Sequence, residues 1–383
     1  MNFDHNKLVS IAKHAKDIGL EMLVMDDGWF GHRDDDRTSL GDWFVADYKL
    51  EKGLGGLIKD VNDLGLKFGI WFEPEMISPE SEIYKAHPDW CIHVGNRDRS
   101  IARNQYVIDF SRQEVRDYVY SMMHKILSEN NIDYLKWDFN RNLTEVAAEH
   151  LPKERQGEVF HRFMLGTYEI MGKLTTDFPH LLIENCSGGG GRFDAGMLYY
   201  SPQIWTSDNT DPIERLTIQF GTSMCYPTST MGAHVSANRR TGYETKMNVA
   251  LWGSFGYELD PDKLTQEEKE EIKAQVELYH RYYNVIHYGD LYRLITPFEN
   301  EFKVAWEHVS EDKNEALVTV VQIKKAYEQF FMLRLKGLDT EKVYVDQESG
   351  KKYSGAYLMN AGLNLTHKPN GDGQSYRIHL IAE

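Results

Sequence analysis

The sequence predicts an α/β fold, in which a (β/α)8-type TIM barrel over residues 1–290 precedes a small antiparallel β-sandwich domain over residues 291–383. Up to about residue 256, helix-like stretches alternate with continuous apolar runs, which indicates parallel strands covered by helices. Beyond residue 290, polar and apolar residues alternate within short segments, as in antiparallel strands. A length of 383 residues suits a barrel of roughly 250 residues with an appended domain.

The barrel strands are predicted from apolar runs at residues 22–25, 68–72, 106–110, 134–137, 181–183, 203–206 and 231–235. The clearest helix is predicted over residues 113–130, where apolar side chains recur on one face with helical spacing. These runs give seven strands, whereas a closed parallel barrel normally has eight. Either one strand is unrecognised, or the first strand is missing from this chain, which begins with a helix.

The C-terminal part begins after a long charged helix predicted at about residues 265–287. Short alternating strands follow at residues 302–306, 316–323, 330–335 and 375–381. An Asn-Gly-Asp-Gly turn at residues 370–373 stands just before the last strand. This pattern predicts the small antiparallel domain.

Composition excludes several classes of partner. The net charge of −16 leaves no basic stripe for nucleic acid or an anionic membrane. The N-terminus lacks the pattern of a signal peptide, and no apolar run approaches the length needed to span a membrane. Cys91, Cys186 and Cys225 have no CxxC spacing, so we expect reduced thiols in a cytoplasmic protein without a zinc site.

Acidic and other polar side chains gather where the predicted strands end. Parallel barrels build active sites at the C-terminal ends of their strands. The side chains at or beside these ends are Asp26, Asp27, Trp71, Glu73, Glu75, Arg103, Lys136, Asp138, Cys186 and Asp208. Strand alternation places Lys136 and Asp138 on one side and Trp137 on the other.

Asp138 and Asp208 are predicted as the catalytic carboxylates of a glycosidase. Cleavage of an acetal needs one carboxylate at the anomeric carbon and one carboxylic acid at the leaving oxygen. Asp138 suits the nucleophile because Lys136 would keep it ionised, and Asp208 suits the acid/base. The alternative for a single such aspartate is a turn or helix N-cap, but Asp211 followed by Pro212 suits the cap better than Asp208 does. Retention requires a carboxyl separation of about 5 Å and inversion roughly 6.5–9.5 Å, and the sequence leaves this open.

The adjacent carboxylates admit two interpretations. Asp26 and Asp27 suit hydrogen bonding to sugar hydroxyls, and Glu73 and Glu75 share one side, where one of them can face an arginine. The alternative is a divalent-metal site formed by these four residues and Asp138. The tryptophans and Arg103 at the same rim favour the sugar.

Two further motifs are predicted to be structural. The Ser-Gly-Gly-Gly-Gly run at residues 187–191 lacks the lysine of a P-loop and is predicted to form a tight loop whose amides approach the ligand. The Arg-Asp-Asp-Asp-Arg run at residues 33–37 is predicted to be a salt-linked surface loop.

Five motifs together resemble the α-galactosidases of glycoside hydrolase family 36. They are VMDDGWF (24–30), GIWFEPEM (69–76), LKWDFNR (135–141), ENCSGGGGR (184–192) and SDNTD (207–211), and the likeness runs in order to about residue 260. The resemblance implies a retaining α-galactosidase that acts on oligosaccharides such as melibiose and raffinose without metal or cofactor. It implies that Asp138 is the nucleophile and Asp208 the acid/base, and that the galactose subsite is lined by Asp26, Asp27, Trp71, Arg103, Lys136 and Cys186.

The chain departs from the family pattern at its start. Family members begin with a β-sandwich domain and a first barrel strand that carries a tryptophan near the sugar, and this sequence shows neither. Full-length family members form tetramers through the sandwich domain, so a homo-oligomer is left open here. Three alternatives remain: an inactive truncated sugar-binding remnant, a galactosyltransferase similar to raffinose synthases, and a metal-dependent barrel lyase.

Overall fold

A computed structural model describes residues 1–145, 147–237 and 241–383 of the chain. The chain divides into two compact units, Met1–Ile204 and Trp205–Glu383, which are described separately. No helix among the described residues is both long enough and apolar enough to cross a membrane.

The first unit is built on parallel strands. Its strands pair in the order β1 (Met22–Met25), β2 (Lys67–Phe72), β5 (Tyr134–Trp137), β6 (Leu182–Asn185) and β7 (Gln203–Trp205). A pair of two-residue antiparallel strands, β3 (Met76–Ile77) and β4 (Tyr106–Val107), lies outside this sheet. The helices are α1 (His5–Asp17), α2 (Gly53–Asp63), α3 (Glu82–Ala86), α4 (Gln113–Glu129), α5 (Val159–Asp177) and α6 (Ala195–Tyr200), with 3-10 turns η1 (Pro88–Trp90) and η2 (Lys153–Glu158).

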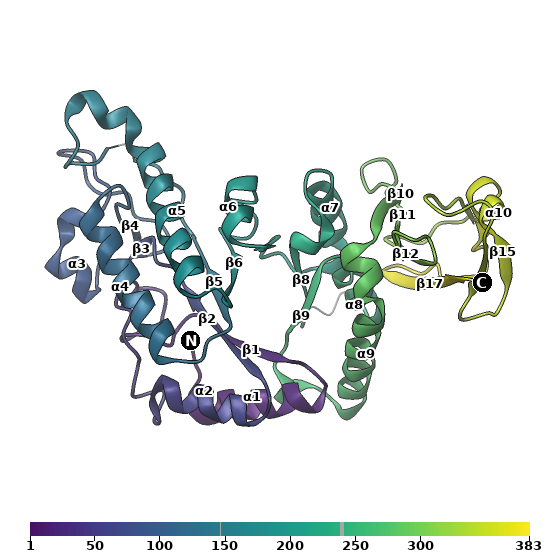
Figure 1. The fold of residues 1–383 in the computed structure, drawn as a ribbon, viewed down its shortest axis with the longest axis horizontal. Coiled ribbons are helices and arrows are strands. Elements are labelled where there is room, and N and C mark those ends of the chain that lie inside the picture. Colours follow the sequence, from purple (N-terminus) through teal and green to yellow (C-terminus); the bar gives the residue numbers. More distant parts are fainter. Residues whose placement is uncertain (146, 238–240) are drawn as a thin grey trace. The chain divides into compact units, whose positions relative to one another are not determined.

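The strand register places the polar side chains of the first unit in a row. Trp71 is the register partner of Lys136, and Lys136 is the partner of Glu184. The alternate residues, such as Phe72 and Leu135, belong to a buried apolar core. Helices α4 and α5 lie side by side and contribute apolar residues to that core (Figure 1). Helix α4 confirms the helix predicted at residues 113–130.

The second unit contains one parallel strand pair and an antiparallel sheet. Strand β8 (Met231–Ser236) pairs with β9 (Ser254–Glu258), and the antiparallel order is β10 (Asp290–Ile295), β11 (Lys303–Val309), β12 (Glu315–Gln322), β17 (Gln374–Ala382), β14 (Val343–Asp346) and β15 (Lys352–Ser354). A two-stranded sheet joins β13 (Met332–Leu333) to β16 (Leu363–Asn364). The helices are α7 (Pro212–Ser223), α8 (Tyr243–Ala250), α9 (Gln266–Tyr288) and α10 (Gly355–Asn360), with 3-10 turns η3 (Thr228–Thr230) and η4 (Pro261–Lys263).

The described residues form as many parallel strands as predicted, but one predicted strand is absent from the parallel sheet and one observed strand was not predicted. The strand predicted at residues 106–110 is wrong, because only Tyr106–Val107 forms a strand, and this strand pairs antiparallel with β3. The run is apolar because it is buried: Phe110 stacks on Phe163 of α5. Strand β9 was missed because Gly256 interrupts its apolar pattern. The described residues therefore contain seven parallel strands, five in the first unit and two in the second.

The α/β fold with a C-terminal antiparallel domain is confirmed. Helix α9 begins at a capping box in which Thr265 and Glu268 exchange hydrogen bonds. Of the predicted C-terminal strands, the one at residues 330–335 shrinks to Met332–Leu333. The domain boundary at residue 290 stays a prediction.

Candidate active site

Predicted site residues of the first unit follow the ends of neighbouring parallel strands. Asp26 follows β1, Glu73 follows β2, Asp138 follows β5 and Cys186 follows β6. Because the strands are parallel and adjacent, these side chains emerge at one edge of the sheet. Asp208 follows β7 and belongs to the second unit.

Asp138 is a nearly buried carboxylate held by two donors. Its side chain is only 7 % exposed. Oδ2 accepts a hydrogen bond from Nε1 of Trp71 at 3.2 Å, and Oδ1 accepts one from the backbone N–H of Phe139 at 2.8 Å. The carboxylate therefore has one fixed orientation. Trp71 is itself 2 % exposed, so little of its ring can reach a ligand.

Lys136 forms an ion pair with Asp26. Its Nζ lies 2.9 Å from Oδ2 of Asp26, whose side chain is 61 % exposed. Burial opposes the lysine charge, but Asp26 and Glu184 outweigh it and raise the pKa of Lys136, so the ammonium group stays charged. As predicted, Trp137 has the opposite orientation, and its Nε1 donates to Glu75 at 2.7 Å.

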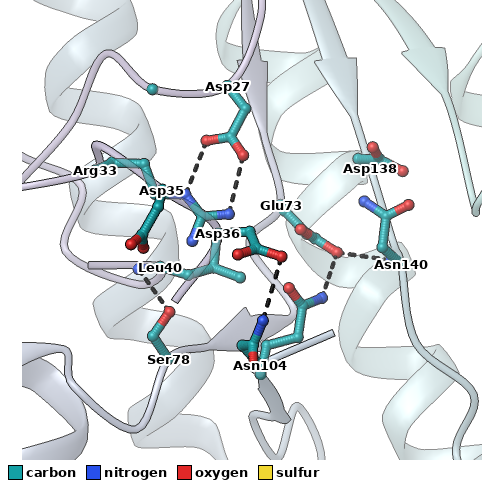
Figure 2. A network of polar contacts seen from close by, with 12 residues as sticks. Asp27, Arg33, Asp35, Asp36, Leu40, Glu73, Ser78, Asn104, Asp138 and Asn140 are labelled. Atoms are coloured by element: carbon teal, nitrogen blue, oxygen red, sulfur yellow. Dashed lines mark hydrogen bonds and ion pairs between the residues drawn. The ribbon is translucent and has the colours of Figure 1, made fainter. Parts of the chain in front are cut away.

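Asp27 forms an ion pair with Arg33, which comes from the loop predicted to lie at the surface. Arg33 is 2 % exposed and binds Asp27 through two hydrogen bonds, Nε to Oδ1 at 3.1 Å and Nη2 to Oδ2 at 2.9 Å (Figure 2). The surface interpretation was therefore wrong for Arg33. The buried ammonium of Lys49 donates to the carbonyl of Gly28 at 2.9 Å and pairs with Asp34 at 3.0 Å. Two buried cations thus fix the loop that follows β1.

Glu73 and Glu75, the two glutamates of the GIWFEPEM motif, have different partners. Glu75 faces Arg192, with Oε1 lying 2.9 Å from Nη1, which confirms that one glutamate faces an arginine. Oε1 of Glu73 accepts from Nε2 of Gln105 at 2.8 Å and from the backbone N–H of Asn140 at 2.6 Å (Figure 2). The sequence analysis missed this junction, although the presence of Glu73 in a recognised motif was a signal for it.

Cys186 is a buried neutral thiol next to Asp138. Burial and the charge of Asp138 raise its pKa, so the thiol keeps its proton. In the following loop the N–H of Ser187 donates to the carbonyl of Gly189 at 2.7 Å. Gly188 and Gly189 have φ values of 53° and 88°, which favour glycine, and confirm the predicted tight loop.

Arg103 lies in the loop before β4. Its backbone is left-handed, with a φ of 51°, and the next residue, Asn104, has a φ of 59°. The side chain of Arg103 is exposed, and its charge acts to lower the pKa of Glu73. The structure thus places Arg103 in the neighbourhood of Glu73.

Asp208 is held within the second unit by an aromatic side chain. Its Oδ1 accepts from Nε1 of Trp205 at 3.1 Å, and the guanidinium of Arg215 lies over the Trp205 ring, 4.6 Å from its centroid. Asp211 accepts from the N–H groups of Ile213 and Glu214 and caps α7 with Pro212 next to it. The predicted cap is confirmed, and Asp208 does not serve that purpose.

The arrangement does not favour the metal interpretation. Three of its five carboxylates pair with cations: Asp26 with Lys136, Asp27 with Arg33, and Glu75 with Arg192. Among the described residues, no three acidic, histidine or cysteine side chains are grouped to hold a metal ion.

A parallel α/β fold with a pair of aspartates after its strand ends is the architecture expected of a barrel glycoside hydrolase. The melibiase family model matches residues 1–289, and the model of the glycosyl hydrolase family 36 C-terminal domain matches residues 303–380. This chain belongs to glycoside hydrolase family 36.

Curated relatives are similar along most of this chain. It is 52 % identical to alpha-galactosidase AgaA of Geobacillus stearothermophilus, covering 96 % of this chain and 51 % of the relative. It is 49 % identical to alpha-galactosidase Mel36A of Lactobacillus acidophilus, covering 94 % and 50 %. The chain therefore spans about half the length of these relatives.

Solved structures have the same fold. The crystal structure of AgaA has a TM-score of 0.97 and 50 % identity, covering all of this chain and 54 % of that one. A substituted variant of AgaA was solved in complex with raffinose, and its structure has the same TM-score, identity and coverage.

Proposed function

We propose that this chain is the galactoside-cleaving part of a retaining α-galactosidase, which removes terminal α-linked galactose from oligosaccharides such as melibiose and raffinose. The observation that carries the proposal is the Asp138 carboxylate, fixed by Trp71 and the Phe139 N–H at a strand end. Membership of family 36 and the raffinose complex of a relative support the substrate class.

Asp138 is the proposed nucleophile and Asp208 the proposed acid/base. Asp138 attacks the anomeric carbon while Asp208 gives its proton to the leaving oxygen, so that a covalent galactosyl-enzyme forms and the aglycone leaves. Asp208 then takes a proton from water, whose oxygen attacks the anomeric carbon and releases galactose and Asp138. This double displacement retains configuration and requires the two carboxyl groups to lie about 5–5.5 Å apart.

The proposed galactose subsite consists of Asp26, Asp27, Trp71, Arg103, Lys136 and Cys186. Asp26 and Lys136 form a partly exposed charged pair suited to sugar hydroxyls. Arg103 presents an exposed guanidinium. Asp27 and Trp71 have internal partners, so a large part of their contribution is to hold the site in shape.

The remaining parts of the proposal concern the whole protein. We expect the reaction to need neither metal nor cofactor, because the proposed groups are carboxylates. We also propose that the protein is cytoplasmic, that it has no nucleic-acid or membrane partner, and that its barrel ends near residue 290. A homo-oligomer is left open.

Hydrolysis of p-nitrophenyl α-galactoside tests the function. We expect the wild-type chain to turn over, and Asp138→Asn to lose activity by about 10³-fold or more because the amide cannot form the galactosyl-enzyme. Asp63→Asn is a matched control, since Asp63 is an exposed aspartate whose partner is Lys59 on the same helix. No turnover by a folded wild-type sample would contradict the proposal and favour a sugar-binding remnant.

A further inference from the structure

One oxygen of Glu73 joins the two loops that carry Asp138 and Arg103. Oε1 accepts from the backbone N–H of Asn140, two residues after Asp138, and from the side-chain amide of Gln105, two residues after Arg103. Figure 2 shows Glu73 between Asn140 and the segment that carries Asn104. A single side chain at the end of β2 thereby contacts both loops, which Arg141 also joins through hydrogen bonds from Nη1 to the carbonyls of Gln105 and Ser100.

Each loop contributes one donor to this acceptor. Gln105 is buried, and the left-handed Arg103 and Asn104 before it need surrounding contacts to hold their conformation. Without the oxygen of Glu73, the Gln105 amide and the Asn140 N–H lose their acceptor, which leaves two donors of the site without a partner.

The charge state of Glu73 bears on Asp138. Burial, followed by the negative charge of Asp138, raises the pKa of Glu73 to about 8, against the opposing effects of its two hydrogen bonds and Arg103. At neutral pH the carboxyl group of Glu73 is therefore mostly protonated, so it does not place a second negative charge near Asp138. Loss of that proton places two negative charges close together in a buried site.

We propose that Glu73 is a positioning residue of the galactoside site, which holds the Asp138 and Arg103 loops together through the hydrogen bonds of one oxygen. The inference rests on the proposed function of Asp138 and assigns no chemical step to Glu73. Ionisation of Glu73 above about pH 8 adds a second negative charge near Asp138, so both loops of the wild-type chain should lose protection from hydrogen exchange as the pH rises through 8.

Glu73→Gln and Glu73→Leu separate this role from simple packing. Glutamine keeps an acceptor oxygen but cannot ionise, so kcat/KM at about pH 6.5 should stay within about 3-fold of wild type, and both loops should keep their protection from hydrogen exchange above pH 8. Leucine removes the acceptor, and kcat should fall about 10²-fold through displacement of Asp138. Glu75→Gln is the control: it loses its ion pair with Arg192, but the two loops should still lose protection from hydrogen exchange above pH 8, as in wild type.

Hydrogen exchange of the same variants, measured on the whole 383-residue chain, gives a readout independent of turnover. Peptides covering residues 138–141 and 103–106 should exchange as slowly in Glu73→Gln as in wild type, and faster in Glu73→Leu. If wild type is inactive but this pattern holds, the proposed function fails while the loop-holding role stands. Equal exchange in all variants, glutamine as impaired as leucine, or the same loss of protection above pH 8 in Glu73→Gln as in wild type would overturn the proposal.

Discussion

Asp26 and Asp27 are neighbours in the sequence but depend on different partners. Asp27 holds the nearly buried Arg33 through two hydrogen bonds, whereas Asp26 pairs with Lys136 from an exposed position. We predict that Asp27→Asn lowers the free energy of unfolding by about 2–3 kcal/mol, because a buried guanidinium loses its counter-ion.

Asp26→Asn is the matched comparison. It should change stability by less than about 1 kcal/mol, because exposed ion pairs contribute little. Its effect should instead be a higher KM for galactoside. Denaturant midpoints and KM values of the two variants check this division, and equal loss of stability in both would contradict it.

At the scale of the elements, β9 is linked through His234 and Trp205 to Asp208, the proposed acid/base. His234 on β8 is the register partner of Gly256, and its ring packs 4.6 Å from that of Trp205, which donates to Asp208. A Cβ at Gly256 would lie 2.7 Å from two atoms of the His234 ring. We predict that Gly256→Ala costs about 1–3 kcal/mol of stability and also lowers kcat, because His234 is pushed toward Trp205.

Gly157→Ala is the control for the glycine substitution, because a Cβ there meets no atom within 4 Å. Replacing this glycine should leave kcat unchanged and stabilise slightly through the unfolded chain. Thermal melting and steady-state kinetics measure both effects. A Gly256→Ala variant with normal kcat would show that Asp208 does not depend on the strand pair.

The apolar patterns of the sequence predicted most strands correctly. They failed where apolar residues are buried outside the sheet and where a glycine interrupts a strand. The run at residues 106–110 resembles a strand because Phe110 packs under α5, and β9 escaped notice because it pairs around Gly256. The same limit applies to the site. Strand ends pointed to Asp138, but the partners Arg33 and Gln105 come from loops, whose paths depend on long-range contacts that no local pattern encodes.

At the scale of the whole molecule, buried ionisable groups predict how stability depends on pH. His308 is 1 % exposed, and burial, reinforced by His287, lowers its pKa to about 3. Within the described part of the chain, neither of its ring nitrogens has a hydrogen-bond partner. The unfolded chain takes up a proton near pH 6.5 while the folded chain does not, so stability is lost as pH falls from 6.5 toward 3.

Two buried carboxyl groups, of Glu307 and Glu73, lower the stability as the pH rises. Burial raises the pKa of Glu307 to about 8, and burial with the charge of Asp138 does the same for Glu73. The unfolded chain releases these protons near pH 4.5, so stability is lost as pH rises from 4.5 toward 8. Each group contributes a slope of up to about 1.4 kcal/mol per pH unit. Between pH 4.5 and 6.5 the two carboxyl groups outweigh the single histidine, so the stability that these groups control should be greatest near pH 4.5.

Single substitutions should change one limb at a time. His308→Phe should flatten the acid limb, since the ring nitrogens lose no partner among the described residues. Glu307→Gln should reduce the slope of the alkaline limb by about half, because its amide oxygen can still accept from the Lys336 N–H while Glu73 still ionises. Denaturant midpoints between about pH 4 and 9 measure both slopes. The net charge of −16 changes by no more than about one unit in either variant, so general repulsion remains a common background. If both variants keep the wild-type slopes, the pH dependence comes from that repulsion and not from the buried groups.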